Sequence, residues 1–63
     1  MSTLAKVQLR HVQVGDRIVI NSHVWNVKYT DGPDRIGTYD VGLIDDWGIS
    51  KIEILTGLVT IEV

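Results

Sequence analysis

The chain has no cysteine, which excludes disulfides and thiolate metal ligands. It has no hydrophobic run near the ~18 residues of a membrane-spanning helix, and its first residues lack the charged and apolar regions of a signal peptide. The basic residues are scattered and the net charge is −2, which argues against strong non-specific binding to nucleic acid. We therefore expect a small cytoplasmic domain that binds no membrane and gains stability from a β-branched core or from association with another chain.

Signatures of catalysis and metal binding are also missing. The only local pair of a nucleophile and a base is Ser22-His23, and sequence neighbours usually point apart in a strand or turn. The chain has no Gly-rich phosphate loop and no nucleophile elbow. His11 and His23 lie on separate segments, whereas zinc sites need three or four ligands. We expect no enzymatic activity, no cofactor and no metal; a divalent cation on the carboxylates of several turns is the weaker alternative.

What the chain has in quantity is valine and isoleucine in short runs that alternate with polar residues, the period of half-buried strands. A length of 63 residues, 44% of them hydrophobic and 22% charged, suits one globular domain over residues 1–63, with residues 1–5 free to fray. No helix longer than one turn is expected. Strands are predicted over residues 7–11, 17–20, 25–30, 38–43, 49–55 and 59–63.

The pattern within these strands also predicts a core. The segment 17–20 is almost continuously apolar, as in a central strand. Trp25, Val27 and Tyr29 alternate with polar residues and are expected to share a core face. Gly42 is expected to mark a bulge or a close approach of the backbone.

Six short strands in so few residues predict an all-β fold, a single small barrel of five to six antiparallel strands. The segment 12–20, in which a hydrophobic-x-hydrophobic-Gly-Asp turn leads into a central strand, is followed by Trp25 and Val27. This segment resembles the opening of SH3-like barrels, found in translation and transcription factors and in short phage-encoded proteins. The resemblance implies an SH3-like barrel but no particular activity.

The connections hold the candidate partner-binding residues. Trp47 lies in an acid-rich turn, where its indole either anchors an interface or folds back as a lid over the barrel end. Tyr39 follows the loop at residues 31–35, so a closed barrel is expected to place Arg35, Tyr39 and Trp47 on a shared rim. The candidate contact residues are Trp47, Tyr39, Arg35, Asp34 and Asp46.

The last two strands bear on assembly. Ile52 and Ile54 share one face of the strand at 49–55. The strand at 58–63 has one charge and no proline, which is typical of an unprotected edge that pairs with a second copy or a partner. The alternative is that its valines and isoleucine close the barrel against the first strand.

Two classes of function fit these expectations. The first is a non-enzymatic protein-interaction module, either a phage-encoded modulator of a host protein or a small assembly subunit that forms homo-oligomers. The second is a nucleic-acid-binding barrel of the KOW type from a transcription or translation accessory protein. It would use Arg10, Arg17, Lys28 and Lys51 on one face, but the acidic net charge disfavours it.

Overall fold

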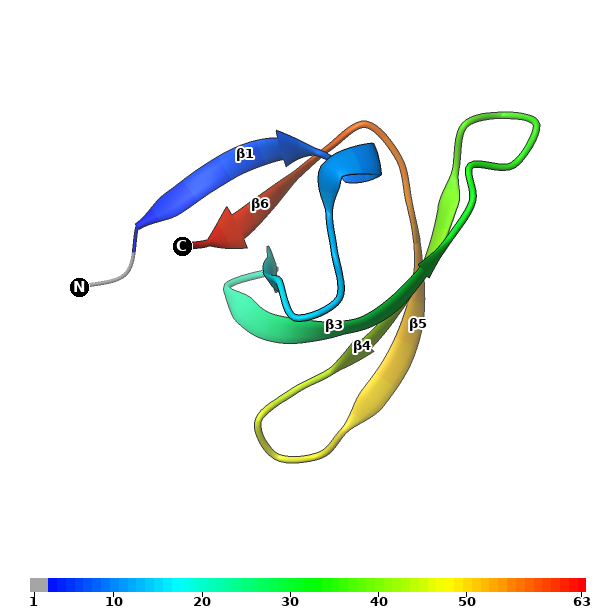
Figure 1. Cartoon of the computed structure of the whole chain (residues 1–63). Coiled ribbons are helices and arrows are strands. Elements are labelled where there is room, and N and C mark those ends of the chain that lie inside the picture. The colour runs from blue at the N-terminus through cyan, green and yellow to red at the C-terminus, as the bar shows by residue number, and fades with distance from the viewer. Residues whose placement is uncertain (1–2) are drawn as a thin grey trace.

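The computed structural model describes residues 3–63, which form a curled antiparallel sheet (Figure 1). The strands are β1 (Leu4–Gln8), β2 (Arg17–Ile20), β3 (His23–Asp31), β4 (Tyr39–Ile44), β5 (Ser50–Leu55) and β6 (Leu58–Glu62), with one 3-10 turn, η1 (Leu9–His11). Their order in the sheet is β1-β6-β2-β3-β4-β5. The all-β class is confirmed. Within residues 3–63 the end strands β1 and β5 share no ladder, so the expected closed barrel is not confirmed.

The segment predicted as a central strand is β2, which pairs with β6 on one side and β3 on the other. Asn21 and Ser22 join β2 to β3 with φ values of 50° and 65°. Two successive left-handed residues are characteristic of the type I′ turn, whose twist matches that of the strands it joins. A polar pair that tolerates this conformation therefore fixes the β2–β3 hairpin.

Of the two interpretations of the last strand, the unprotected edge is wrong. The strand β6 pairs with β1 from Leu4↔Glu62 to Gln8↔Leu58 and with β2 from Arg17↔Glu62 to Val19↔Thr60. Its backbone groups are therefore used on both sides, and the alternative pairing with the first strand is confirmed. The partner that covers the second side, β2, is distant in the sequence, so no local pattern in β6 reveals it.

The predicted core face of β3 is right for Trp25 and Val27 but wrong for Tyr29. The β3–β4 register shifts between Val27 and Tyr29, so that Lys28 has no opposite residue. This bulge moves Tyr29 to the outer face of the sheet, where it is 40% exposed. Its ring occupies the space that a Cβ at Gly42 would need, so the close approach expected at Gly42 is confirmed.

The start of the chain also differs from the expectation. Leu4 and Ala5 belong to β1, whereas residues 1 and 2 lie outside the described part of the chain. The β1–β6 pairing ends at Gln8↔Leu58 with one further bond in register, from the Leu9 N–H to Gly57 O at 2.9 Å, and the chain then turns through η1. This turn buries the Leu9 side chain instead of continuing the strand to residue 11.

The core lies on the inner face of the curled sheet. Partly buried side chains from β1, β2, β4, β5 and β6 surround a fully buried centre. The buried centre consists of Leu9, Val12, Ile18, Trp25, Val27, Val41 and Leu43.

Among residues 3–63, no helix combines the length and the apolar composition needed to cross a membrane.

Candidate interaction surface

The turn between β4 and β5 is organised by one buried carboxylate, that of Asp45. Its Oδ1 accepts hydrogen bonds from the backbone N–H groups of Trp47 at 3.0 Å and Ile49 at 2.8 Å. Gly48, with φ 85°, supplies the left-handed residue that lets the chain re-enter β5. The backbone of Trp47 is therefore held in place at the tip of the hairpin.

The side chains beside this turn form a series that runs from the core to the solvent. Trp25 is buried, His23 packs against it with ring centroids 4.7 Å apart, and Trp47 lies 5.9 Å beyond His23. The His23 Nε2 is also 3.2 Å from Asp45 Oδ2. Trp47 remains 79% exposed, so it does not fold back as a lid over the core.

A polar network flanks the other side of the turn. The Arg17 guanidinium contacts Glu62 Oε1 at 3.0 Å, Asn26 Oδ1 at 3.0 Å and Asp46 Oδ2 at 3.5 Å. The Asn26 amide donates to the carbonyl of Ile44 and to Asp46 Oδ1, both at 3.2 Å. Asp46 thus forms a hydrogen bond and an ion pair within the chain. Its carboxylate remains exposed, and Asp46 directly precedes Trp47 in the sequence.

These contacts set the pKa of the two acids in the turn. Burial raises the pKa of Asp45, but the hydrogen bonds from Ile49 N–H, His23 and Trp47 N–H together hold it below its usual value. The hydrogen bond from Asn26, followed by the bond and charge of Arg17, lowers the pKa of Asp46. Both groups are carboxylates at neutral pH.

No protein-family model, curated protein or solved structure matches the chain. Among residues 3–63, no group of three or more histidines and carboxylates lies close enough to bind a metal ion. The features that bear on function are therefore the exposed side chains of this chain.

The structure does not bring the candidate contact residues together. The β3–β4 loop and the β4–β5 turn lie at opposite ends of β4 (Figure 1). Arg35 and Tyr39 are therefore separated from Trp47 by the length of β4, and the expected shared rim does not form. Trp47 and Asp46 do share one turn, which we call the Trp47 turn (residues 45–49).

Asp34 and Tyr39 serve the β3–β4 loop itself. The Asp34 carboxylate accepts from the N–H groups of Ile36 and Thr38 and from the Thr38 hydroxyl at 2.6 Å. The Thr38 hydroxyl and N–H, with the Ile36 N–H, hold the pKa of Asp34 below its usual value. Tyr39 packs against the core, while Arg35 is exposed. Asp34 therefore orders the loop while remaining exposed, and a contact role for Asp34, Arg35 and Tyr39 stays a prediction.

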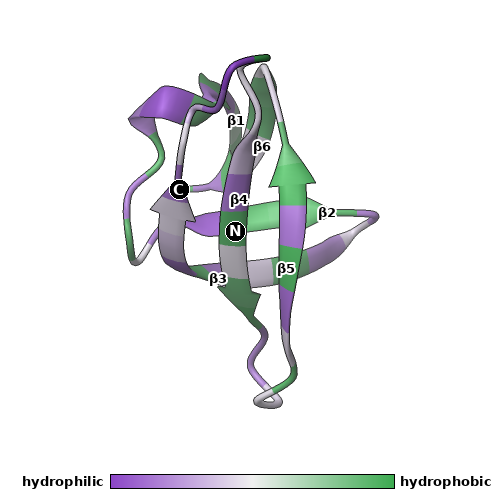
Figure 2. Cartoon of the chain, turned by 90° about the vertical axis from the view of Figure 1, so that its right-hand side faces the viewer, coloured by the Kyte–Doolittle hydropathy of each residue, from purple (hydrophilic) through white to green (hydrophobic). Residues whose placement is uncertain are grey.

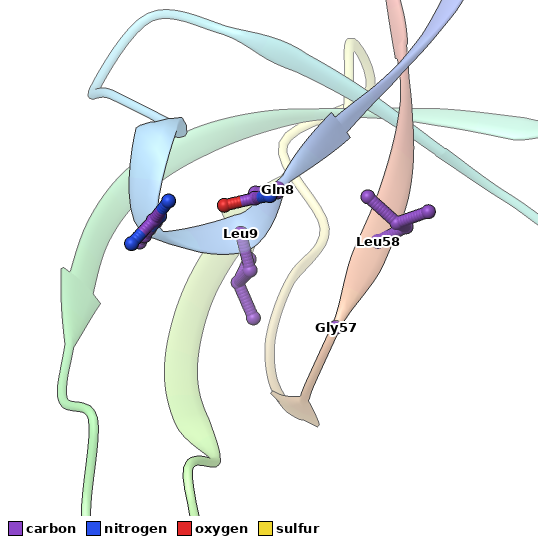
Figure 3. Close-up of a pocket in the computed structure, with 5 residues that line it drawn as sticks. Gln8, Leu9, Gly57 and Leu58 are labelled. Carbon is purple, nitrogen blue, oxygen red and sulfur yellow. The ribbon is translucent and has the colours of Figure 1, made fainter.

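A hollow lies where η1 meets the β5–β6 turn (Figure 3). Gln8 and Leu58 face each other across the β1–β6 ladder at its rim, and the buried Leu9 forms its floor. The only ionisable residue in its lining is Arg10. Beside the apolar side chains, the lining offers one amide, that of Gln8, and one cation, that of Arg10.

Sequence reasoning did not identify the exposed pair of isoleucines on the outer face of β5. Ile52 and Ile54 share one face of β5, as predicted, but that face points to solvent and they are 65% and 69% exposed. The signal was present in the alternate residues Lys51 and Glu53, which occupy the inner face of the same strand. Figure 2 shows β5 at the side of the sheet beside β4, with hydrophobic and hydrophilic residues alternating along it.

Proposed function

We propose that this protein is a non-enzymatic interaction module that binds a partner protein through the Trp47 turn. The observation that carries the proposal is an indole that is 79% exposed although its backbone is fixed by the buried Asp45. Tryptophan is among the residues that most often anchor protein interfaces. Because the turn is already ordered, binding at Trp47 loses little conformational entropy.

The neighbouring side chains support an anchor of this kind. Ile49 is 60% exposed on the same turn, and the His23 ring backs the indole. Asp46 and Arg17 add charges of both signs at its border. An apolar centre with a polar border is the usual anatomy of a protein interface.

Three further hypotheses accompany this proposal. The curled sheet is a variant of the SH3-like barrel, as the resemblance of residues 12–20 implies. The protein acts in the cytoplasm. It is a phage-encoded modulator of a host protein or a subunit of a small assembly.

The nucleic-acid alternative has less support. Of the four basic residues considered for it, Arg17 is paired with Glu62 and Asp46, and Lys51 with Glu53 at 2.8 Å. Paired cations release fewer counterions from a phosphate backbone than free ones. A partner that is lost on nuclease treatment and whose affinity falls steeply with salt would favour this alternative.

The test is site-specific photocrosslinking. A photoreactive amino acid at position 49, which is 60% exposed on the same turn and leaves Trp47 in place, is expected to capture one protein from the native lysate, with and without nuclease. The captured protein is then purified and its affinity for the wild-type chain is measured. Trp47→Ala is expected to weaken binding by at least about tenfold, the size of effect that an interface anchor produces.

Ile36 provides the matched control, because it is 80% exposed in the β3–β4 loop at the other end of β4. Crosslinking from position 36 and the affinity of Ile36→Ala are expected to show no specific partner and no loss of binding. Equal capture from both positions, or an unchanged affinity for Trp47→Ala, would contradict the proposal.

A further inference from the structure

The strand β5 is the last in its sheet, and within residues 3–63 it pairs with β4 alone. The direction of its free backbone groups follows from the turn that precedes it. Asp45 N–H donates to Ile49 O at 2.9 Å, so these two residues form a hydrogen-bonded pair. Hydrogen-bonded and non-bonded pairs alternate in an antiparallel ladder. The N–H and C=O groups of Ser50, Ile52 and Ile54 therefore point away from β4.

The two faces of β5 differ in polarity over residues 51–54. The outer face carries the exposed Ile52 and Ile54. The inner face carries Lys51 and Glu53, which form an ion pair at 2.8 Å and whose side chains are 34% and 36% exposed. The Lys51 ammonium also lies 4.4 Å from the centre of the Trp25 ring. Charges that point inward on an edge strand oppose pairing with an ordinary amphipathic strand, because they would face apolar side chains.

A second copy of β5 can place an opposite charge across from each member of this ion pair. We propose that two copies of the chain associate by antiparallel pairing of β5 with β5, with Ile52 facing Ile52 of the second copy on a two-fold axis. In this register Lys51 faces Glu53 of the second copy, and Glu53 faces its Lys51. Oppositely charged residues directly across an antiparallel pair attract each other. The interface is isologous and closes as a dimer.

The charges also exclude the neighbouring registers. A shift of two residues in one direction places Lys51 opposite Lys51 of the second copy, and a shift in the other direction places Glu53 opposite Glu53. Like charges directly across a pair are destabilising. A shift of one residue places the free N–H and C=O groups of one β5 opposite backbone groups of the other β5 that already bond to its β4. It also places the isoleucines of one copy on the same face as the charged residues of the other. One register therefore combines free backbone groups with complementary charge.

This register uses the free backbone groups of both strands. Ile52 pairs with Ile52 of the second copy, and Ser50 pairs with its Ile54, each pair exchanging both N–H···O bonds. On the outer face the two Ile52 side chains lie side by side, next to Gly42 and the Tyr29 ring of each copy. The sheets of the two copies thereby become continuous, with an apolar strip across the junction.

The dimer goes beyond the proposed function, because Trp47 takes no part in the ladder. The Trp47 turns remain at the outer ends of the paired strands. An interface of two strands lies at the small end of the range for stable complexes, so we expect a Kd of about micromolar or weaker. Failure of either proposal leaves the other standing, since one depends on Trp47 and the other on β5.

The test is sedimentation equilibrium of charge-swapped variants over ~1 µM to ~1 mM protein, a range that brackets this affinity. Lys51→Glu alone and Glu53→Lys alone place like charges opposite each other, so each is expected to be monomeric. The double variant restores complementary pairs and is expected to be dimeric. An equimolar mixture of the two single variants is expected to form a heterodimer, because each strand then faces its opposite in charge.

Lys6→Glu is the matched control, since it makes the same charge reversal on the other end strand, and it is expected to remain dimeric. Circular dichroism and unfolding curves establish that each variant is folded. The double variant also lacks the contact between the Lys51 ammonium and the Trp25 ring, so it controls for the loss of that contact. A wild-type chain that is monomeric throughout, or larger than a dimer, would overturn the proposal. So would single variants as dimeric as the wild type.

Discussion

The two end strands of the sheet, β1 and β5, arrange the same kinds of residue in opposite ways. In β1 the free backbone groups belong to Leu4, Lys6 and Gln8, as the hydrogen-bonded pair of Thr3 and Val63 indicates. The outer face of β1 therefore has a lysine at its centre, while its inner face carries the apolar Ala5 and Val7.

In β5 the two isoleucines are outside and the charges are inside, with Leu55 at the end of the strand packed on the core. Ile52 occupies the place on the outer face that Lys6 occupies in β1, and Lys51 and Glu53 lie on the inner face. A central lysine beside free backbone groups is a common protection of an edge strand. The outward lysine of β1 therefore opposes pairing with any further strand. The inward charges of β5 oppose pairing with most strands, but they are complementary to a second copy of β5.

The most direct way to break this difference is to give β5 the lysine of β1. Ile52→Lys places two ammonium groups on the axis of the dimer, and we expect its dissociation constant to rise by roughly a hundredfold or more, about 2.7 kcal/mol. Leu4→Lys is the matched change on β1, where the residue is 57% exposed, and it should leave the dimer intact. Sedimentation distinguishes the two; equal effects would mean that β5 is not the pairing strand.

A second prediction concerns the turn that leads into β5. Asp45→Ala leaves the N–H groups of Trp47 and Ile49 without their acceptor, so we expect the melting temperature to fall by several degrees. Hydrogen exchange should increase first in β5 and the Trp47 turn, and last in β1. The control is Asp40→Ala, which removes an exposed acid opposite Asp31 and should leave the melting temperature unchanged or slightly higher. A uniform increase in exchange would contradict this account of the turn.

Acid should weaken the β5 side of the sheet before the β1 side. The pKa values of Asp34, Asp45 and Asp46 are lower in the folded protein than the unfolded value of about 3.9, so the folded state binds fewer protons. Their contribution to stability is full above about pH 5 and is lost as the pH falls through the folded pKa values. The strand β1 contains no acid. Hydrogen exchange at about pH 3 and pH 6 checks this, and equal loss of protection in β1 and β5 at the lower pH would contradict it.

The smallest effect is expected at Gly42. A methyl group there overlaps the Tyr29 ring, which is partly exposed and can swing into solvent. Gly42→Ala should therefore increase the exposure of Tyr29, seen in its fluorescence and ring NMR shifts, with only a modest loss of stability. Gly57→Ala gives a comparison, because a Cβ there meets no atom within 4 Å, although its positive φ of 74° adds strain. A Tyr29 environment unchanged in Gly42→Ala would disprove the contact.

Much of the fold could be predicted from local patterns. A nearly continuous apolar run located β2, and alternation located β4 to within a residue or so, because β4 has a buried face and a regular period. The same rule failed at Tyr29, because a bulge at Lys28 breaks the period and leaves no mark in composition. Alternation located the last strand, but it could not show that β6 pairs with β2 as well as with β1, since both ladders join residues far apart in the chain.

The candidate site, too, was predicted correctly only in part. Trp47 was identified correctly as a turn residue, but a shared rim with Arg35 required a closed barrel that the sheet does not form. Ile52 and Ile54 alternate just as Val41 and Leu43 do, and period alone shows which residues share a face, not which face is covered. The inward Lys51 and Glu53 were the clue that the covered face of β5 is the charged one.

Disulfide crosslinking measures the pairing of β5 most directly, because the chain has no cysteine of its own. In the proposed register the two Cα atoms at position 52 lie about 5.5 Å apart, within the range of a disulfide. The two Cα atoms at position 54 are offset by four residues, about 13 Å along the strands. Under mild oxidation Ile52→Cys should form a covalent dimer much faster than Ile54→Cys. Equal rates, or faster crosslinking at position 54, would contradict the pairing.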